Sequence, residues 1–126
     1  MTYAAHRRII DVDSHLFELD DFLHNAARPE HLDLVPSMHA QKGLAVPQAG
    51  LDRGRELLAR RQSDPATMAK FEAALMDNTK SGWSRLGAFD PKERSHTLDL
   101  LGFEMQWVLP TYAFHQTLHA AHGDAL

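Results

Sequence analysis

The stretch DPKERSHTLDLLGFEMQWVLP, residues 90–110, decides the fold because it contains a helix and a strand with a clear boundary between them. Asp90 suits the N-cap of a helix, Pro91 suits its first turn, and Glu93 is placed to bond back to the cap. Gly102 is typical of a helix end, and the aromatic and branched residues after it favour a strand. The pattern therefore predicts a helix at residues 91–101 and a strand at residues 103–109.

A second strand is indicated near the N-terminus. The segment HRRIIDVD, residues 6–13, places three β-branched residues before acidic turn residues, which is typical of a short buried strand. A helical stretch is also expected at residues 112–122. Parallel strands need a crossover, and a helix usually supplies it, so the alternation of strand and helix predicts the α/β class with two parallel strands.

A long insertion separates the first strand from its crossover helix. Residues 14–90 are 77 residues, whereas strand-to-helix loops usually have only about 2–6 residues. Short helical turns are expected at residues 19–27 and 29–34. Two amphipathic helices should follow, one containing RGRELLARR and one in which four apolar residues share a face: Met68, Phe71, Ala74 and Leu75. In (β/α) barrels, loops that follow the strands form the active-site face, so this insertion is expected there.

Composition excludes several classes of function. The 126 residues carry a formal net charge of −4, so there is no basic field to hold nucleic acid. No apolar run approaches the roughly 20 residues that span a bilayer, and the N-terminal segment does not have the pattern of a secretion signal. We therefore expect no membrane partner and a cytoplasmic location. The chain has no Cys but nine His, so any metal must be held by imidazoles and carboxylates.

The string IIDVDSHLFE carries the clearest candidate chemistry. Asp13 and His15 are two residues apart at the expected end of a strand, where this spacing places both side chains on one face. A carboxylate and an imidazole can then converge on one cation. Asp11 lies one step deeper and is a candidate to orient His15. Asp and His at such positions also serve as turn or capping residues, so the spacing alone leaves both interpretations open.

Two segments together resemble a known family, the amidohydrolase-related metal enzymes of the aminocarboxymuconate-semialdehyde decarboxylase type. IIDVDSHLFE is similar to that family's opening strand, with its D-x-(H or D)-x-H pattern followed by an acid, here Glu18. GAFDPKERSHTLDLLGFEMQWVLPT, residues 87–111, is similar to the family's first crossover helix and second strand. The two segments span 35 residues, and the insertion between them matches only as a long variable region.

The resemblance implies the N-terminal part of a (β/α)8 TIM barrel with a divalent metal, zinc or manganese, at the strand ends. Asp13 and His15 take the positions of the two first-strand ligands, and Asp11 and Glu18 support them from outside the ligand set. The Asp at the first ligand position resembles the variants found among aromatic-acid decarboxylases, and a carboxylate favours a harder ion such as manganese. The implied reaction is decarboxylation, hydration or hydrolysis of a small carboxylated or cyclic substrate.

In this interpretation the catalytic groups belong to later strands, so the chain alone is expected to be inactive and to self-associate, because two strands leave their edges and faces uncovered. The alternative from the residues is a short helical interaction module, or a decayed enzyme, whose apolar face binds a partner. Other candidate site residues have a structural explanation as well. They are His115, His119 and His122 at helical spacing and the irregularly placed His24, His31 and His39, together with Trp83 as a pocket residue and Ser14 as a nucleophile. The arginines Arg53, Arg55, Arg60 and Arg61 form a helix face that either attracts an anion or is simply solvated.

Overall fold

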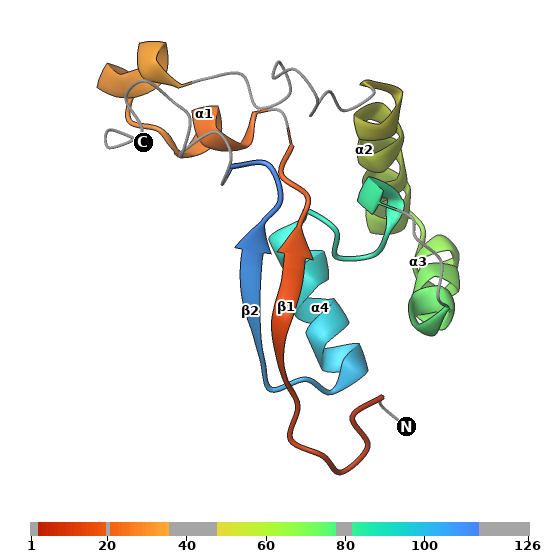
Figure 1. The fold of residues 1–126 in the computed structure, drawn as a ribbon. Helices are drawn as coiled ribbons and strands as arrows, with labels where there is room; N and C mark the ends of the chain where they lie inside the picture. Colours follow the sequence, from red (N-terminus) through yellow and green to blue (C-terminus); the bar gives the residue numbers. More distant parts are fainter. Residues whose placement is uncertain (1–2, 20, 36–47, 78–81, 114–126) are drawn as a thin grey trace.

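The computed structural model describes residues 3–19, 21–35, 48–77 and 82–113. Figure 1 shows two parallel strands with one helix behind them, and a group of helices to one side. The elements follow one another along the chain in this order: β1 (Ile10–Leu16), α1 (Phe22–Ala26), η1 (Pro29–Leu34), α2 (Gln48–Ser63), α3 (Pro65–Ala73), η2 (Ala74–Met76), η3 (Gly82–Ser84), α4 (Pro91–Leu101) and β2 (Met105–Pro110). The mixed α/β class predicted from the sequence is confirmed for these residues.

The crossover helix α4 has the bounds that the sequence predicts. The Asp90 side chain accepts a hydrogen bond from the backbone N–H of Glu93 at 2.9 Å, which satisfies one of the free donors at the helix start. Gly102 ends the helix at φ 73°, a left-handed conformation that costs glycine little. The sequence predicts that the Glu93 carboxylate bonds back to the cap. In the structure it pairs with Arg61 of α2 instead.

Both strands are displaced along the chain from their expected positions. β1 begins four residues later and ends three residues later than the predicted segment 6–13, and β2 begins two residues later than predicted. The pairing decides these limits: Ile10 lies opposite Met105 and Leu16 opposite Pro110 in a parallel ladder. The residues just before β1 turn back instead, and the N–H of Ala4 bonds to the carbonyl of Leu101 at 2.8 Å.

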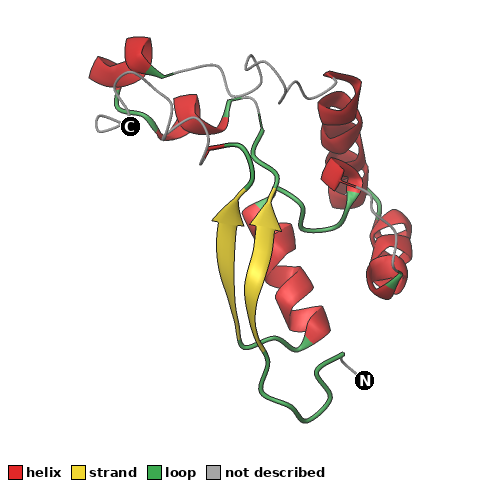
Figure 2. Cartoon of the chain, viewed as in Figure 1, coloured by secondary structure: helices red, strands yellow, loops and turns green. Residues whose placement is uncertain are grey.

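The helices expected within the insertion are present where the structure describes it. α1, η1, α2 and α3 match the two short turns and the two longer helices, and Figure 2 shows α2 and α3 beside the strand-helix-strand unit. Asp64 caps α3 by accepting hydrogen bonds from the backbone N–H groups of Ala66 and Thr67. The bond from the Thr67 hydroxyl is the main reason that the Asp64 pKa lies below its ordinary value.

A buried ion pair joins α2 to α4. The Arg61 guanidinium donates to both carboxylate oxygens of Glu93, at 2.6 and 2.8 Å, and a third bond reaches the carbonyl of Ser84 at 3.2 Å. Its planar group also lies 4.6 Å from the ring centre of Phe71. Arg61 is 2% exposed, so the expectation that all the arginines of this helix face solvent is wrong for Arg61. A bidentate pair with this geometry fixes how the two helices meet.

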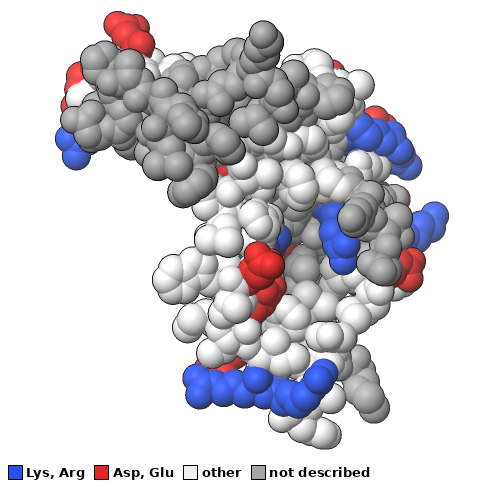
Figure 3. Space-filling model, in the orientation of Figure 1, with Lys and Arg blue, Asp and Glu red and all other residues white. Residues whose placement is uncertain are grey.

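The apolar side of the sheet is not buried, which corrects the expectation of two core strands. Val12 is 69% and Trp107 is 68% exposed, and Ile10 and Met105 are exposed as well. Figure 3, viewed from the side opposite α4, shows a largely uncharged surface over the strands with a small acidic group. None of the described residues covers this face, so it lies open to solvent.

Two further expectations have a limited outcome. No helix in the described parts of the chain is long and apolar enough to cross a membrane. The helix expected at residues 112–122 lies almost wholly outside the described residues, which end at residue 113.

Candidate metal site on strand β1

Strand β1 brings Asp13 and His15 together. The pairing with β2 is irregular between Asp11 and Ser14, so the strand contains a local bulge that includes Asp13, one of the two candidate ligands. The Asp13 Oδ1 and His15 Nε2 atoms lie 3.7 Å apart, and the two side chains are 86% and 50% exposed. Both atoms can therefore contact one ion at the usual ligand distance of about 2.0–2.2 Å.

The donor set of these two residues fits half of a metal site. One carboxylate oxygen and one imidazole nitrogen suit either zinc or manganese, the two ions expected from the sequence. Within the described residues, no third His, Cys, Asp or Glu joins them in a cluster of three. His24 and His31 lie on α1 and η1 respectively, and the remaining candidates, His39, His115, His119 and His122, lie outside the described residues.

Asp11 is held away from His15 by other partners. Its carboxylate accepts hydrogen bonds from the Gln106 side-chain amide at 3.0 Å and from the backbone N–H of Asp13 at 3.2 Å. The second bond supports the bulge, since it holds the backbone of Asp13 itself. Asp11 therefore acts on Asp13 through the backbone, whereas the sequence suggested that it orients the His15 ring.

The Glu18 carboxylate binds the backbone of the residues that follow β2. Glu18 is 1% exposed, and its carboxylate accepts hydrogen bonds from three consecutive backbone N–H groups, those of Thr111, Tyr112 and Ala113, at 2.9–3.2 Å. Charge-assisted bonds of this kind tie the exit of β1 to the exit of β2. Burial, and secondarily the Glu18 charge, raise the pKa of Tyr112. Glu18 thus positions the edge on which a ligand would lie.

An aromatic group lies close to this edge. The Trp83 ring stacks on Tyr112 with ring centres 5.6 Å apart and planes 7° apart. Phe17 packs against the same Trp83 ring in a tilted arrangement, with ring centres 5.2 Å apart. Trp83 belongs to η3, within the long insertion, while Phe17 and Tyr112 directly follow the two strands. The expectation that Trp83 lines a pocket is replaced by a packing role: it holds the insertion against the strand ends.

The sequence missed a polar network on the α4 side of the sheet. Arg94 of α4 donates to the side chain of Gln106 at 2.9 Å, to the carbonyl of Gly87 at 3.0 Å and to the hydroxyl of Ser14. The bond from Arg94 gives Ser14 a structural partner, which is the structural explanation that the sequence left open beside a nucleophile. The sequence feature that could have predicted this network is the position of Arg94. It lies three residues after Pro91, one helical turn into α4, where a long side chain can reach both strands.

Comparisons with known proteins place the chain in no group. No family model, no curated protein and no solved structure matches it.

Proposed function

We propose that this chain is the N-terminal part of a metal-dependent decarboxylase or hydrolase built on a (β/α)8 barrel, acting on a small carboxylated or cyclic substrate. The observation that carries the proposal is the pair of donor atoms, Asp13 Oδ1 and His15 Nε2, 3.7 Å apart near the carboxyl end of a parallel strand. Ligands of enzymes with parallel sheets bind at that end of the strands.

The open face of the sheet supports the same proposal. Val12 and Trp107 would be buried if further strands closed a barrel around them, and the covered side already has its helix, α4. In a barrel, the side of the strands away from the helices faces the interior. The catalytic acid and base would come from later strands, so we expect the 126-residue chain to bind a metal without turnover.

Asp13 and His15 would hold a divalent zinc or manganese ion, with Asp11 keeping the Asp13 backbone in place. The ion, when bound, supplies Lewis acidity for a substrate carboxylate or carbonyl. Glu18 would hold the exits of β1 and β2 at a fixed spacing beneath the substrate.

The alternative function, a helical module that binds a partner through an apolar face, has less support. Leu75 is 7% exposed, and Phe71 lies under the Arg61 guanidinium, so these two residues are used within the molecule. Met68 is partly buried as well. The proposed binding face of α3 is therefore occupied by its own neighbours.

Titration of the chain with Mn²⁺, followed by electron paramagnetic resonance of the free ion, tests the proposal. His115, His119 and His122 are first replaced by Asn, so that a second cluster cannot contribute. In this background, Asp13→Asn and His15→Asn should each weaken binding by about tenfold or more, because each removes a ligand.

His24→Asn serves as the matched control because this exposed histidine of α1 should leave Mn²⁺ binding unchanged. Zn²⁺ is then tested by competition against Mn²⁺. Equal binding in the parent and in both ligand variants, or no binding at all, would contradict a metal site at Asp13 and His15.

A further inference from the structure

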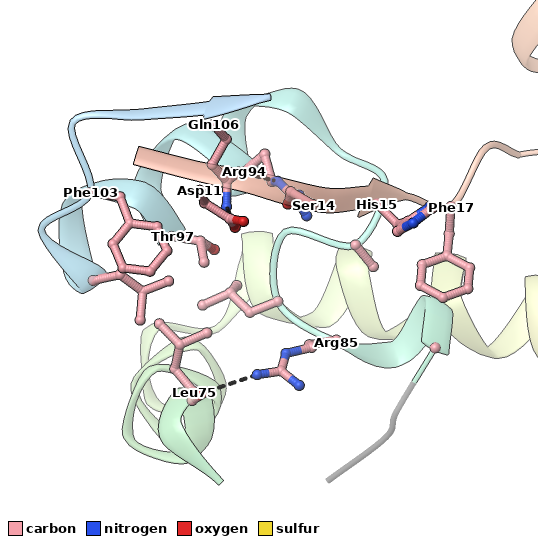
Figure 4. A pocket seen from close by; sticks show the side chains of 14 residues that line it. Asp11, Ser14, His15, Phe17, Leu75, Arg85, Arg94, Thr97, Phe103 and Gln106 are labelled. Atoms are coloured by element: carbon pink, nitrogen blue, oxygen red, sulfur yellow. Dashed lines mark hydrogen bonds between the residues drawn. The ribbon is translucent and has the colours of Figure 1, made fainter. Parts of the chain in front are cut away.

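A cavity of about 520 Å³ lies on the α4 side of the sheet, between this side and the segment that contains η2 and η3. Its volume is within the range of about 300–1,000 Å³ that is typical of small-molecule sites. Figure 4 shows Asp11, Ser14, Arg94 and Gln106 grouped along the strands, with Arg85 across the cavity from them. Apolar side chains, among them Leu86, Leu101 and Phe103, complete the wall.

Arg94 brings a partly buried positive charge to this cavity. Its three hydrogen bonds go to an amide oxygen, a backbone carbonyl and a hydroxyl, all of them neutral acceptors. Among the described residues, no carboxylate lies within ion-pair distance of its guanidinium. Burial lowers the pKa of Arg94, while the more distant Asp11 carboxylate raises it. A partly buried cation with neutral partners is stabilised when an anion approaches it.

Arg85 adds a second positive charge on the opposite wall. Its side chain donates to the carbonyl of Leu75 at 3.0 Å and lies on the wall opposite the strands (Figure 4). Its charge also acts on Arg94, whose pKa it lowers, so the two guanidinium groups contribute to one local field. The described residues that line the cavity include two arginines and one carboxylate, that of Asp11, so their positive charges outnumber the negative one.

We propose that this cavity binds a small organic carboxylate, with the carboxylate between Arg85 and Arg94 and an apolar body against Leu101 and Phe103. Arginine is suited to this task because its planar group donates two parallel hydrogen bonds to a carboxylate. Phosphate would satisfy the charge but would leave the apolar wall unused. His15 lines the cavity as well, but the inference does not depend on the proposed metal site, since it rests on Arg85 and Arg94, neither of which is a proposed metal ligand.

Calorimetric titration of the full chain with benzoate, benzamide and inorganic phosphate tests the proposal. Benzoate should bind, while the neutral benzamide and the compact phosphate should each bind at least about tenfold more weakly, because each lacks one of the two recognised features. Arg85→Gln should weaken benzoate binding by about tenfold, as expected for loss of a charged partner. Arg94→Lys keeps the charge but loses the planar donor pair, so it should reduce binding by a similar factor.

Three controls separate the possible explanations. Arg53→Gln removes an exposed arginine of α2 that is paired with Glu56, and it should leave benzoate binding unchanged. Asp13→Asn should remove the metal ligand but not benzoate binding, so failure of the metal site and failure of this cavity are distinguishable. A second readout is the amide spectrum of Arg85→Gln, which should match the parent away from the cavity and so exclude unfolding.

Two results would overturn the carboxylate site. One is the absence of benzoate binding at concentrations up to the order of 10 mM, where even sites of very low affinity fill appreciably. The other is equal affinity for benzoate and benzamide, because a cavity that does not distinguish them recognises only the apolar ring.

Discussion

The two sides of the β1–β2 sheet differ in a way that reverses the usual arrangement. The side covered by α4 carries polar groups: Arg94 donates to Ser14 and Gln106, and Gln106 donates to Asp11. The open side carries the large apolar residues, with Val12 and Trp107 about two-thirds exposed. Apolar burial normally drives strands together, so a sheet with its apolar side in water has not used its main source of stabilisation.

This contrast shows where the described unit obtains its stability. Its tightest contacts are ionic and directional: Arg61 with Glu93, Arg94 with its three acceptors, and Glu18 with three backbone amides. Such contacts define geometry strongly, but they contribute less net free energy than the burial of a large apolar surface. The covered side should therefore be sensitive to single substitutions, and the open side insensitive.

The largest effect is expected for the buried ion pair on the covered side. Arg61→Met leaves the Glu93 carboxylate buried without its cation, which should lower the free energy of unfolding by about 3–5 kcal/mol. Urea denaturation followed by circular dichroism measures this change. The expectation rests on the burial of both partners and on their bidentate geometry.

The double variant Arg61→Met with Glu93→Gln should recover most of this loss, because it removes the uncompensated charge. Arg53→Met provides the exposed control: its pair with Glu56 faces solvent and should contribute less than about 1 kcal/mol. A loss below about 1 kcal/mol for Arg61→Met would show that α2 and α4 do not depend on this pair.

A smaller effect is expected where the two strands end. Glu18→Gln keeps the shape of the side chain but removes the charge to which three backbone N–H groups donate. The free energy of unfolding should therefore fall by about 2 kcal/mol. The pKa of Tyr112 should also fall toward its ordinary value of 10.0, without reaching it, because burial is the larger cause of its shift.

Ultraviolet absorbance titration follows the Tyr112 pKa. The chain has two tyrosines, so the measurement is made with Tyr3→Phe, which leaves Tyr112 as the single phenol. Glu30→Gln, an exposed carboxylate of η1, is the matched control and should change neither quantity. An unchanged Tyr112 pKa in Glu18→Gln would mean that the two groups do not interact.

The smallest effect on stability is expected on the open side. Val12→Thr and Trp107→Thr replace exposed apolar groups, so each should change the free energy of unfolding by no more than about 0.5 kcal/mol. Self-association should decrease, since the described residues leave an apolar face open and the strand edges unpaired, and both features favour contacts between copies. Sedimentation velocity over a range of concentrations measures this decrease.

Met76→Thr is the control for this comparison, because Met76 is exposed in η2 and away from the sheet. It should leave association unchanged. A parent chain that is monomeric at all concentrations, or a large loss of stability in Trp107→Thr, would show that the open side is already covered.

Much of the local structure follows from short-range signals in the sequence. Asp90, Pro91 and Gly102 define the limits of α4, and the structure has the same limits. Asp64 and Pro65 likewise define the start of α3. These signals act through the few backbone groups at a helix end, which a neighbouring side chain can satisfy without help from the rest of the fold. The spacing of Asp13 and His15 predicts that they lie side by side, and the structure places their donor atoms 3.7 Å apart.

Only the tertiary structure decided the strand limits, the burial of each face and the partners of the charged residues. The strands shifted because their ends depend on which residues of the other strand lie opposite, not on local preference. Arg61 looks like any exposed arginine of an amphipathic helix until α4 places Glu93 against it. The resemblance places Glu18 and Asp11 beside a metal. In the structure, the Glu18 carboxylate accepts hydrogen bonds from backbone amides and the Asp11 carboxylate accepts one from Gln106. Sequence determines what a residue can bind, whereas the packing of distant segments determines which partner is within reach.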